Sequence, residues 1–127
     1  MKKILLVDDE HDQIFGIKTA LEETYQGEYE VIPAETGEKC INLLTQGTAP
    51  DLILLDIMMP EMSGWETFDK LKGNESWGKI PVVFLTARTD RIAKNAGGFL
   101  GDDYIEKPFE ITELKRRIDE ITNRKNI

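Results

Sequence analysis

Short runs of apolar residues alternate along the chain with longer stretches in which apolar residues recur every three or four positions. Continuous apolar runs are typical of strands buried on both faces, and the longer spacing is typical of amphipathic helices. The five predicted strands are the runs at residues 4–7, 31–32, 52–55, 82–85 and 104–105. The predicted helices are marked by Ile14, Ile17, Leu21 and Tyr25; by Cys40, Ile41 and Leu44; by Trp65, Phe68 and Leu71; and by Ile111, Leu114, Ile118 and Ile121. Ile92 and Ala96 predict a further helix, which Gly97 and Gly98 shorten.

Alternation of strands and helices predicts a parallel sheet with helices on both faces. Pro33 removes a backbone donor from the second run and favours an edge position, and the fifth run is short and ends in Glu106 and Lys107, which favours the other edge. The predicted fold is therefore α/β: a doubly wound, flavodoxin-like, five-stranded parallel sheet in the order 2-1-3-4-5. In that order, ligands bind at the carboxyl ends of the first and third strands.

Composition narrows the function classes. The chain has 127 residues and a net charge of −8, so we expect one domain over residues 1–127, without an effector domain and without a surface for nucleic acid. The single cysteine, Cys40, excludes a disulfide framework within the chain. No apolar run approaches the ~18 residues of a membrane span, and the start of the chain does not fit a signal peptide. We therefore expect a cytoplasmic protein that does not interact with membranes.

Chemically complementary residues stand where the predicted strands end. Asp8 and Asp9 follow the first strand, Asp56 follows the third, Thr86 the fourth and Lys107 the fifth. Taken singly, an Asp here is usually a helix cap, a Thr an ordinary strand residue and a Lys a solvated charge. Together, the acids require a counter-charge, for which oxygen-liganded Mg²⁺ is suited, and the hydroxyl and ammonium favour a phosphoryl group. The pattern predicts a magnesium-dependent phosphoryl site.

Four motifs carry a resemblance to a known family: LLVDDE at residues 5–10, LILLDIMMPEMSG at 52–64, VVFLTA at 82–87 and DDYIEKPF at 102–109. Over essentially its whole length the chain resembles a response-regulator receiver domain of two-component signalling. The spacing from Asp56 through Met59 and Pro60 to Gly64 is the most specific part of this resemblance.

The resemblance implies a role for each residue of the site. Asp56 would be the phosphoacceptor, and Mg²⁺ would be held by Asp9, Asp56 and the backbone carbonyl of Met58, with Asp8 holding a metal-bound water. Thr86 and Lys107 would contact the phosphoryl oxygens. The peptide bond between Lys107 and Pro108 would be cis, and the small side chain of Ala87 would leave room beside the phosphoryl group. Pro60 and Gly64 would be structural residues at the site.

Phosphorylation would be read out by movement of Thr86 and Tyr104, which changes the surface of the fourth helix and fifth strand. The implied partners are a sensor histidine kinase or a phosphotransfer protein, and a downstream protein target or effector domain. The chain would not be an enzyme acting on other molecules, although it would catalyse its own phosphorylation and dephosphorylation. The segment from Thr86 to Lys107 is one residue shorter than the family pattern, which affects the fourth helix more than the site.

Other functions are less compatible with these residues. A pseudo-receiver, which binds partners without being phosphorylated, typically lacks one of the acids, the Thr or the Lys, all of which are present. A flavin- or nucleotide-binding enzyme needs a phosphate loop where Asp8, Asp9 and Glu10 stand, and a phosphohydrolase needs an acid where Met58 stands. The basic residues near the end of the chain are interpreted as a solvated helix face: Lys115, Arg116, Arg117, Arg124 and Lys125. The oligomeric state is left open.

Overall fold

The computed structural model describes residues 1–57, 59, 64–87 and 103–125. Within these ranges, the side chains of Thr86, Ala87, Asp103, Arg124 and Lys125 are not described. The predicted helix at Ile92 and Ala96 therefore lies outside the described residues.

The sheet has the predicted parallel order. Its strands are β1 (Lys2–Val7), β2 (Tyr29–Ala34), β3 (Leu52–Asp56), β4 (Val82–Ala87) and β5 (Asp103–Lys107). They form one sheet in the order β2-β1-β3-β4-β5, and every neighbouring pair is parallel. Pro33 lies in β2 at one edge, and β5 forms the other, so both predicted edges are confirmed.

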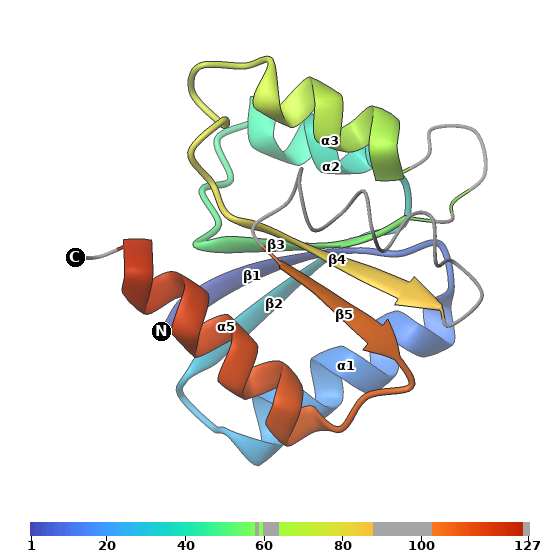
Figure 1. Ribbon diagram of the computed structural model, residues 1–127, viewed down its shortest axis with the longest axis vertical. Coiled ribbons are helices and arrows are strands. Elements are labelled where there is room, and N and C mark those ends of the chain that lie inside the picture. Colours follow the sequence, from blue (N-terminus) through green and yellow to red (C-terminus); the bar gives the residue numbers. More distant parts are fainter. Residues whose placement is uncertain (58, 60–63, 88–102, 126–127) are drawn as a thin grey trace.

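Helices cover both faces of this sheet. They are α1 (His11–Thr24), α2 (Gly37–Thr45), α3 (Gly64–Lys72) and α5 (Ile111–Lys125). In Figure 1, α2 and α3 lie over one face, while α1 and α5 lie over the other. The doubly wound α/β class predicted from the sequence is therefore confirmed.

The core consists of two apolar layers that share the sheet. Successive side chains of a strand point to opposite faces, so Ile4 and Leu6 pack with α1 and α5, whereas Leu5 and Val7 pack with α2 and α3. All four are fully buried. Burial on both faces explains why β1 is a continuous apolar run, and it places the acids that follow β1 on a rigid support.

Cys40 belongs to the layer beneath α2 and α3. Burial raises the pKa of its thiol to about 12, so the side chain acts as a small apolar group.

No helix within the described ranges is both long enough and apolar enough to cross a membrane.

Candidate functional site

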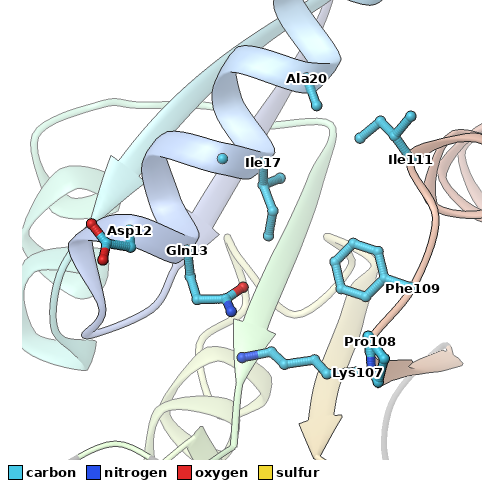
Figure 2. Close-up of a pocket in the computed structure, with 9 residues that line it drawn as sticks. Asp12, Gln13, Ile17, Ala20, Lys107, Pro108, Phe109 and Ile111 are labelled. Carbon is cyan, nitrogen blue, oxygen red and sulfur yellow. The ribbon is translucent and has the colours of Figure 1, made fainter.

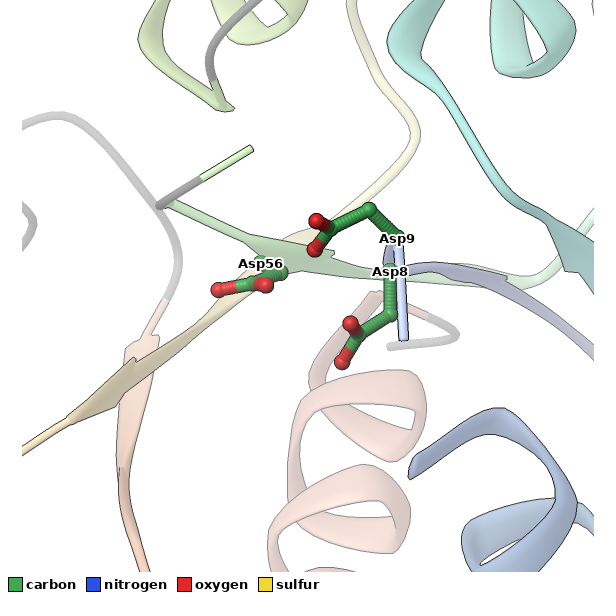
Figure 3. A group of neighbouring side chains, drawn as sticks. All are labelled: Asp8, Asp9 and Asp56. Atoms are coloured by element: carbon green, nitrogen blue, oxygen red, sulfur yellow. The ribbon is translucent and has the colours of Figure 1, made fainter. Parts of the chain in front are cut away.

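Three aspartates meet at the carboxyl ends of the two central strands. Asp56 is the last residue of β3, and Asp8 and Asp9 directly follow β1, its neighbour in the sheet. One carboxylate oxygen of each lies within 4.8 Å of those of the other two. Figure 3 shows the three side chains beside one another at these strand ends. The strand order, rather than proximity in the sequence, brings Asp56 to Asp8 and Asp9.

The loop that carries Asp8 is held by hydrogen bonds. Asp8 is fully buried, and its backbone N–H donates to the carbonyl oxygen of Ala34 at 3.1 Å. Its Oδ1 accepts a hydrogen bond from the backbone N–H of Glu10 at 3.0 Å. Asp56 is only 7% exposed, whereas Asp9 is half-buried. The three carboxylates therefore differ in access to solvent, and Asp9 lies at the more open side.

Lys107 brings a positive charge to the acids from the end of β5. Its Nζ lies 3.4 Å from Asp8 Oδ2 and 3.9 Å from Asp56 Oδ1. The side chain reaches Asp56 across β4 and reaches Asp8 across β4 and β3, and it is only 20% exposed. The Lys107–Pro108 peptide bond is cis, as expected. Among the residues that the structure describes, one ammonium faces three carboxylates here, which leaves an excess of negative charge, and a hard divalent cation with oxygen ligands fits this donor set.

Gly64 allows α3 to begin against the backbone of Asp56. Its N–H donates to the carbonyl oxygen of Ile57 at 2.9 Å. A Cβ atom at this position would lie 2.6 Å from the Cα of Ile57, and still closer to the carbonyl oxygen of Asp56. Only glycine permits so close an approach, and Gly64 therefore shapes the site through the backbone of Asp56.

The other predicted site residues are described in part. The backbones of Thr86 and Ala87 lie at the end of β4, in register with Glu106 and Lys107 of β5. Their side chains, together with Met58 and Pro60, lie outside the described part of the chain. Tyr104 lies in β5 and packs, half-buried, against the core layer that includes Phe84.

A cavity that the sequence did not predict lies beside Lys107. It has a volume of about 520 Å³ and lies between α1 and the segment that follows β5. In Figure 2, the Lys107 side chain extends toward α1, with Gln13 opposite its ammonium group. The other walls are mostly apolar and include Ile17, Ala20 and Phe109. No motif signals this cavity, because its two walls are far apart in the sequence and meet only through packing.

Comparison with known proteins agrees with this geometry. The family described as "Response regulator receiver domain" matches residues 4–119. The chain belongs to this family. The resemblance to receiver domains inferred from the motifs is thus confirmed. The three aspartates of the acidic cluster all lie within the matched residues.

Two relatives and one solved structure illustrate the similarity. The receiver domain is 42% identical over 125 residues to "Transcriptional regulatory protein CpxR" of Escherichia coli, covering 98% of this chain and 50% of that protein. It is 39% identical over 116 residues to a "Probable cyclic di-GMP phosphodiesterase" of Vibrio cholerae, covering 91% of this chain and 25% of that protein. The signal receiver domain of a histidine kinase from Syntrophus aciditrophicus superposes with a TM-score of 0.85 at 32% identity, covering 97% and 91% of the two chains.

The receiver domain spans half or less of these two curated relatives. The two relatives carry names for different activities, yet each matches this chain over nearly all of its length, so what they share with it is the receiver portion. Receiver function, and not transcriptional regulation or phosphodiesterase activity, is therefore the level at which this chain can be compared with them.

Proposed function

We propose that this receiver domain is a phosphorylation-dependent signalling switch that accepts a phosphoryl group on Asp56. The phosphoryl donor would be a sensor histidine kinase, a phosphotransfer protein or a small phosphodonor, and the reaction would require Mg²⁺. The observation that carries the proposal is that the Asp56 carboxylate lies close both to two further aspartates and to the ammonium group of Lys107. A carboxylate nucleophile in this setting lies beside the positive charge that an incoming phosphoryl group needs.

The donor set supports a magnesium site formed by Asp9 and Asp56, with the backbone carbonyl of Met58 as a third ligand and Asp8 acting through a bound water. When bound, Mg²⁺ would neutralise charge on the phosphoryl oxygens. Asp8 is fully buried and 3.4 Å from Lys107 Nζ, which supports a positioning role for it.

Phosphoryl transfer then uses the chain's own side chains. A carboxylate oxygen of Asp56 forms a bond to phosphorus while the bond from phosphorus to the donor's leaving atom breaks, which gives an aspartyl phosphate. Lys107 Nζ and the hydroxyl of Thr86 would hold the phosphoryl oxygens. Hydrolysis of the aspartyl phosphate would return the domain to its initial state.

Output would pass through the surface around β5. The proposed switch residues are Thr86, at the end of β4, and Tyr104, which packs on the Phe84 layer. If this surface has two packings, a difference of a few kcal/mol in their contacts with the phosphoryl group is enough to shift the equilibrium from one to the other. The reader of the switch would be a downstream protein target or an effector domain. We include in this proposal a cytoplasmic location and a single receiver domain over residues 1–127.

The decisive test is intact-mass spectrometry after incubation with Mg²⁺ and acetyl phosphate. We expect the mass of one phosphoryl group to be added to the native chain and to the control Asp69→Asn, whose replaced side chain is exposed on α3. Asp56→Asn should gain none, because the amide is not a nucleophile toward phosphorus.

A negative result is made interpretable by titrating beryllofluoride and Mg²⁺ into the native chain. Binding of beryllofluoride without a detectable adduct would support an aspartyl phosphate that is hydrolysed too quickly to be detected. Binding of Mg²⁺ without either result would reject the switch in favour of a pseudo-receiver that binds partners without phosphorylation. An adduct that persists in Asp56→Asn would place the acceptor elsewhere.

A further inference from the structure

The outer edge of β2 presents one set of backbone groups to solvent or to another chain. The N–H of Lys2 donates to the carbonyl oxygen of Glu28 at 2.9 Å, and the N–H of Asp8 donates to that of Ala34 at 3.1 Å. In a parallel pair, alternate residues bond to the same neighbour, so the even-numbered residues of β2 face β1. The odd-numbered residues Tyr29, Val31 and Pro33 therefore point their backbone polar groups away from β1, toward the open side of this edge strand.

Two side chains of α1 occupy the backbone groups of Val31. The N–H of Val31 donates to Glu22 Oε2 at 2.8 Å, and its carbonyl oxygen accepts from Lys18 Nζ at 2.8 Å. Lys18 and Glu22 also bond to each other at 2.9 Å, which closes a ring of three contacts. Both polar groups of the central outward-facing residue of β2 are thus paired within the chain.

The charge on Glu22 is adapted to this role. Burial by itself raises the pKa of the Glu22 carboxyl, but hydrogen bonds from Val31 and Lys18 outweigh it and lower the pKa below its ordinary value. The side chain therefore stays ionised at neutral pH and accepts a charge-assisted hydrogen bond from the strand. Next along the edge, Pro33 has no N–H to offer.

We propose that Lys18 and Glu22 form a cap that closes the outer edge of β2 against addition of a strand from a second copy of this chain. An added strand must exchange N–H and C=O bonds with successive outward-facing residues. Here the backbone N–H and carbonyl oxygen of Val31 are already bonded to Glu22 and Lys18. The next outward-facing residue of β2 is Pro33, which has no N–H to donate. An ion pair at i and i+4 supports its own helix only weakly, so the two bonds to Val31 are the contacts that explain this pair. The proposal is independent of phosphorylation.

Hydrogen exchange measured by NMR tests the cap directly. We expect Glu22→Ala to speed exchange of the Val31 amide by about tenfold to a hundredfold, because a charge-assisted bond is lost. The Ile53 amide, bonded to Pro81 in the centre of the sheet, serves as the internal reference for global opening. Glu22→Gln keeps an oxygen acceptor and should restore most of the protection.

The matched control is Glu120→Ala, which removes the acid of an exposed i, i+4 ion pair with Arg116 on α5. It should leave the Val31 rate, relative to that of Ile53, within about twofold of the native value, as expected for an exposed pair. An unchanged relative rate in Glu22→Ala would overturn the proposed cap.

Association is tested by light scattering on the Lys18→Ala/Glu22→Ala double variant. We expect its mass to rise with concentration beyond that of the native chain and of Glu120→Ala, because the groups of Val31 become available for strand pairing. If the double variant does not fold, Lys18→Ala, which exposes only the carbonyl, is measured in the same way. Faster Val31 exchange with no added association would overturn the claim that the cap blocks a second copy.

Discussion

At the scale of single residues, two glycines on helices play different parts. Gly64 lies at the start of α3, where an added Cβ would lie 2.6 Å from the Cα of Ile57. Gly16 lies within α1, and a Cβ there meets nothing within 4 Å. Close approach requires glycine at the first position, while at the second glycine only weakens the helix.

We therefore expect Gly64→Ala to lower the free energy of unfolding by about 1–3 kcal/mol, because backbone must move to relieve the overlap. Gly16→Ala should raise it by about 0.5–1 kcal/mol through helix propensity. Urea denaturation of both variants measures the two effects. If Gly64→Ala were as stable as the native chain, the close contact between α3 and the backbone of Asp56 would be wrong.

At the scale of elements, α5 is attached to the sheet by a polar cluster at the end opposite the acidic site. Asp119 accepts hydrogen bonds from Lys2 Nζ at 3.0 Å, the Tyr29 hydroxyl at 2.6 Å and Lys115 Nζ at 2.5 Å. Lys115 also lies 5.1 Å from the ring centroid of Tyr25 and 5.7 Å from that of Tyr29. The cluster joins α5 to β1, to β2 and to the end of α1.

The burial and pairing of the basic residues of α5 correct one interpretation of the sequence. The basic residues of α5 were expected to form a solvated face. Of the three whose side chains the structure describes, Lys115 and Arg117 are half-buried and paired, and Arg116 is exposed; the side chains of Arg124 and Lys125 lie outside the described part. Long side chains can bury their aliphatic stems while the charge finds a partner, and the helical pattern of apolar residues does not reveal such pairing.

The cluster predicts a dependence of stability on pH. Burial raises the pKa of the Asp119 carboxyl, but the hydrogen bonds from Lys115, Tyr29 and Lys2 lower it below its ordinary value. A lowered folded-state pKa gives stability that is complete above the unfolded value of about 4 and is lost as the pH falls through the folded value. We expect Asp119→Asn to be less stable than the native chain at pH 7, with the difference shrinking as the pH falls below about 4.

Urea midpoints of both proteins, measured from pH 7 down to pH 3, test this expectation. Glu28 also lies 3.6 Å from Lys115 Nζ, and because it is unchanged in both proteins, its own titration affects the two alike. Asp69→Asn, exposed on α3, is the control and should show no such convergence with the native chain. A difference between native and Asp119→Asn that stayed constant down to pH 3 would mean that ionisation of Asp119 is not its source.

At the scale of the whole molecule, both core layers share one sheet, so neither can open without exposing the other. We expect one cooperative unfolding transition, seen alike by circular dichroism and by fluorescence of Trp65 and Trp77.

Mg²⁺ at ten times its dissociation constant should then stabilise the whole fold by about 1.4 kcal/mol, and Asp9→Asn should lose most of that gain.

Sodium chloride at matched ionic strength is the control, because a chain of net charge −8 is also stabilised by screening. Separate midpoints for the two probes would contradict a single cooperative unit. An equal effect of Mg²⁺ on the native chain and on Asp9→Asn would contradict a magnesium site at the three aspartates.

Much of the fold followed from local pattern. Continuous apolar runs indicated strands buried on both faces, and Pro33 favoured an edge because a missing N–H costs a ladder hydrogen bond in a central strand. Once the strand order was inferred, Asp8, Asp9 and Asp56 had to meet, because parallel strands end at the same side of the sheet. The acidic site could be predicted because strand order and residue type are both expressed in the sequence.

The sequence by itself determined the α/β class, the strand order, the family and the acids at the strand ends, since each depends on periodicity or on residues at set spacings. The tertiary structure alone decided which distant side chains touch. Lys107 reaches Asp8 across β4 and β3, Lys18 and Glu22 bond to the edge of β2, and a cavity forms between α1 and the segment after β5. Such contacts depend on the packing distance between elements and on side-chain rotamers, neither of which is expressed in any local pattern of residues.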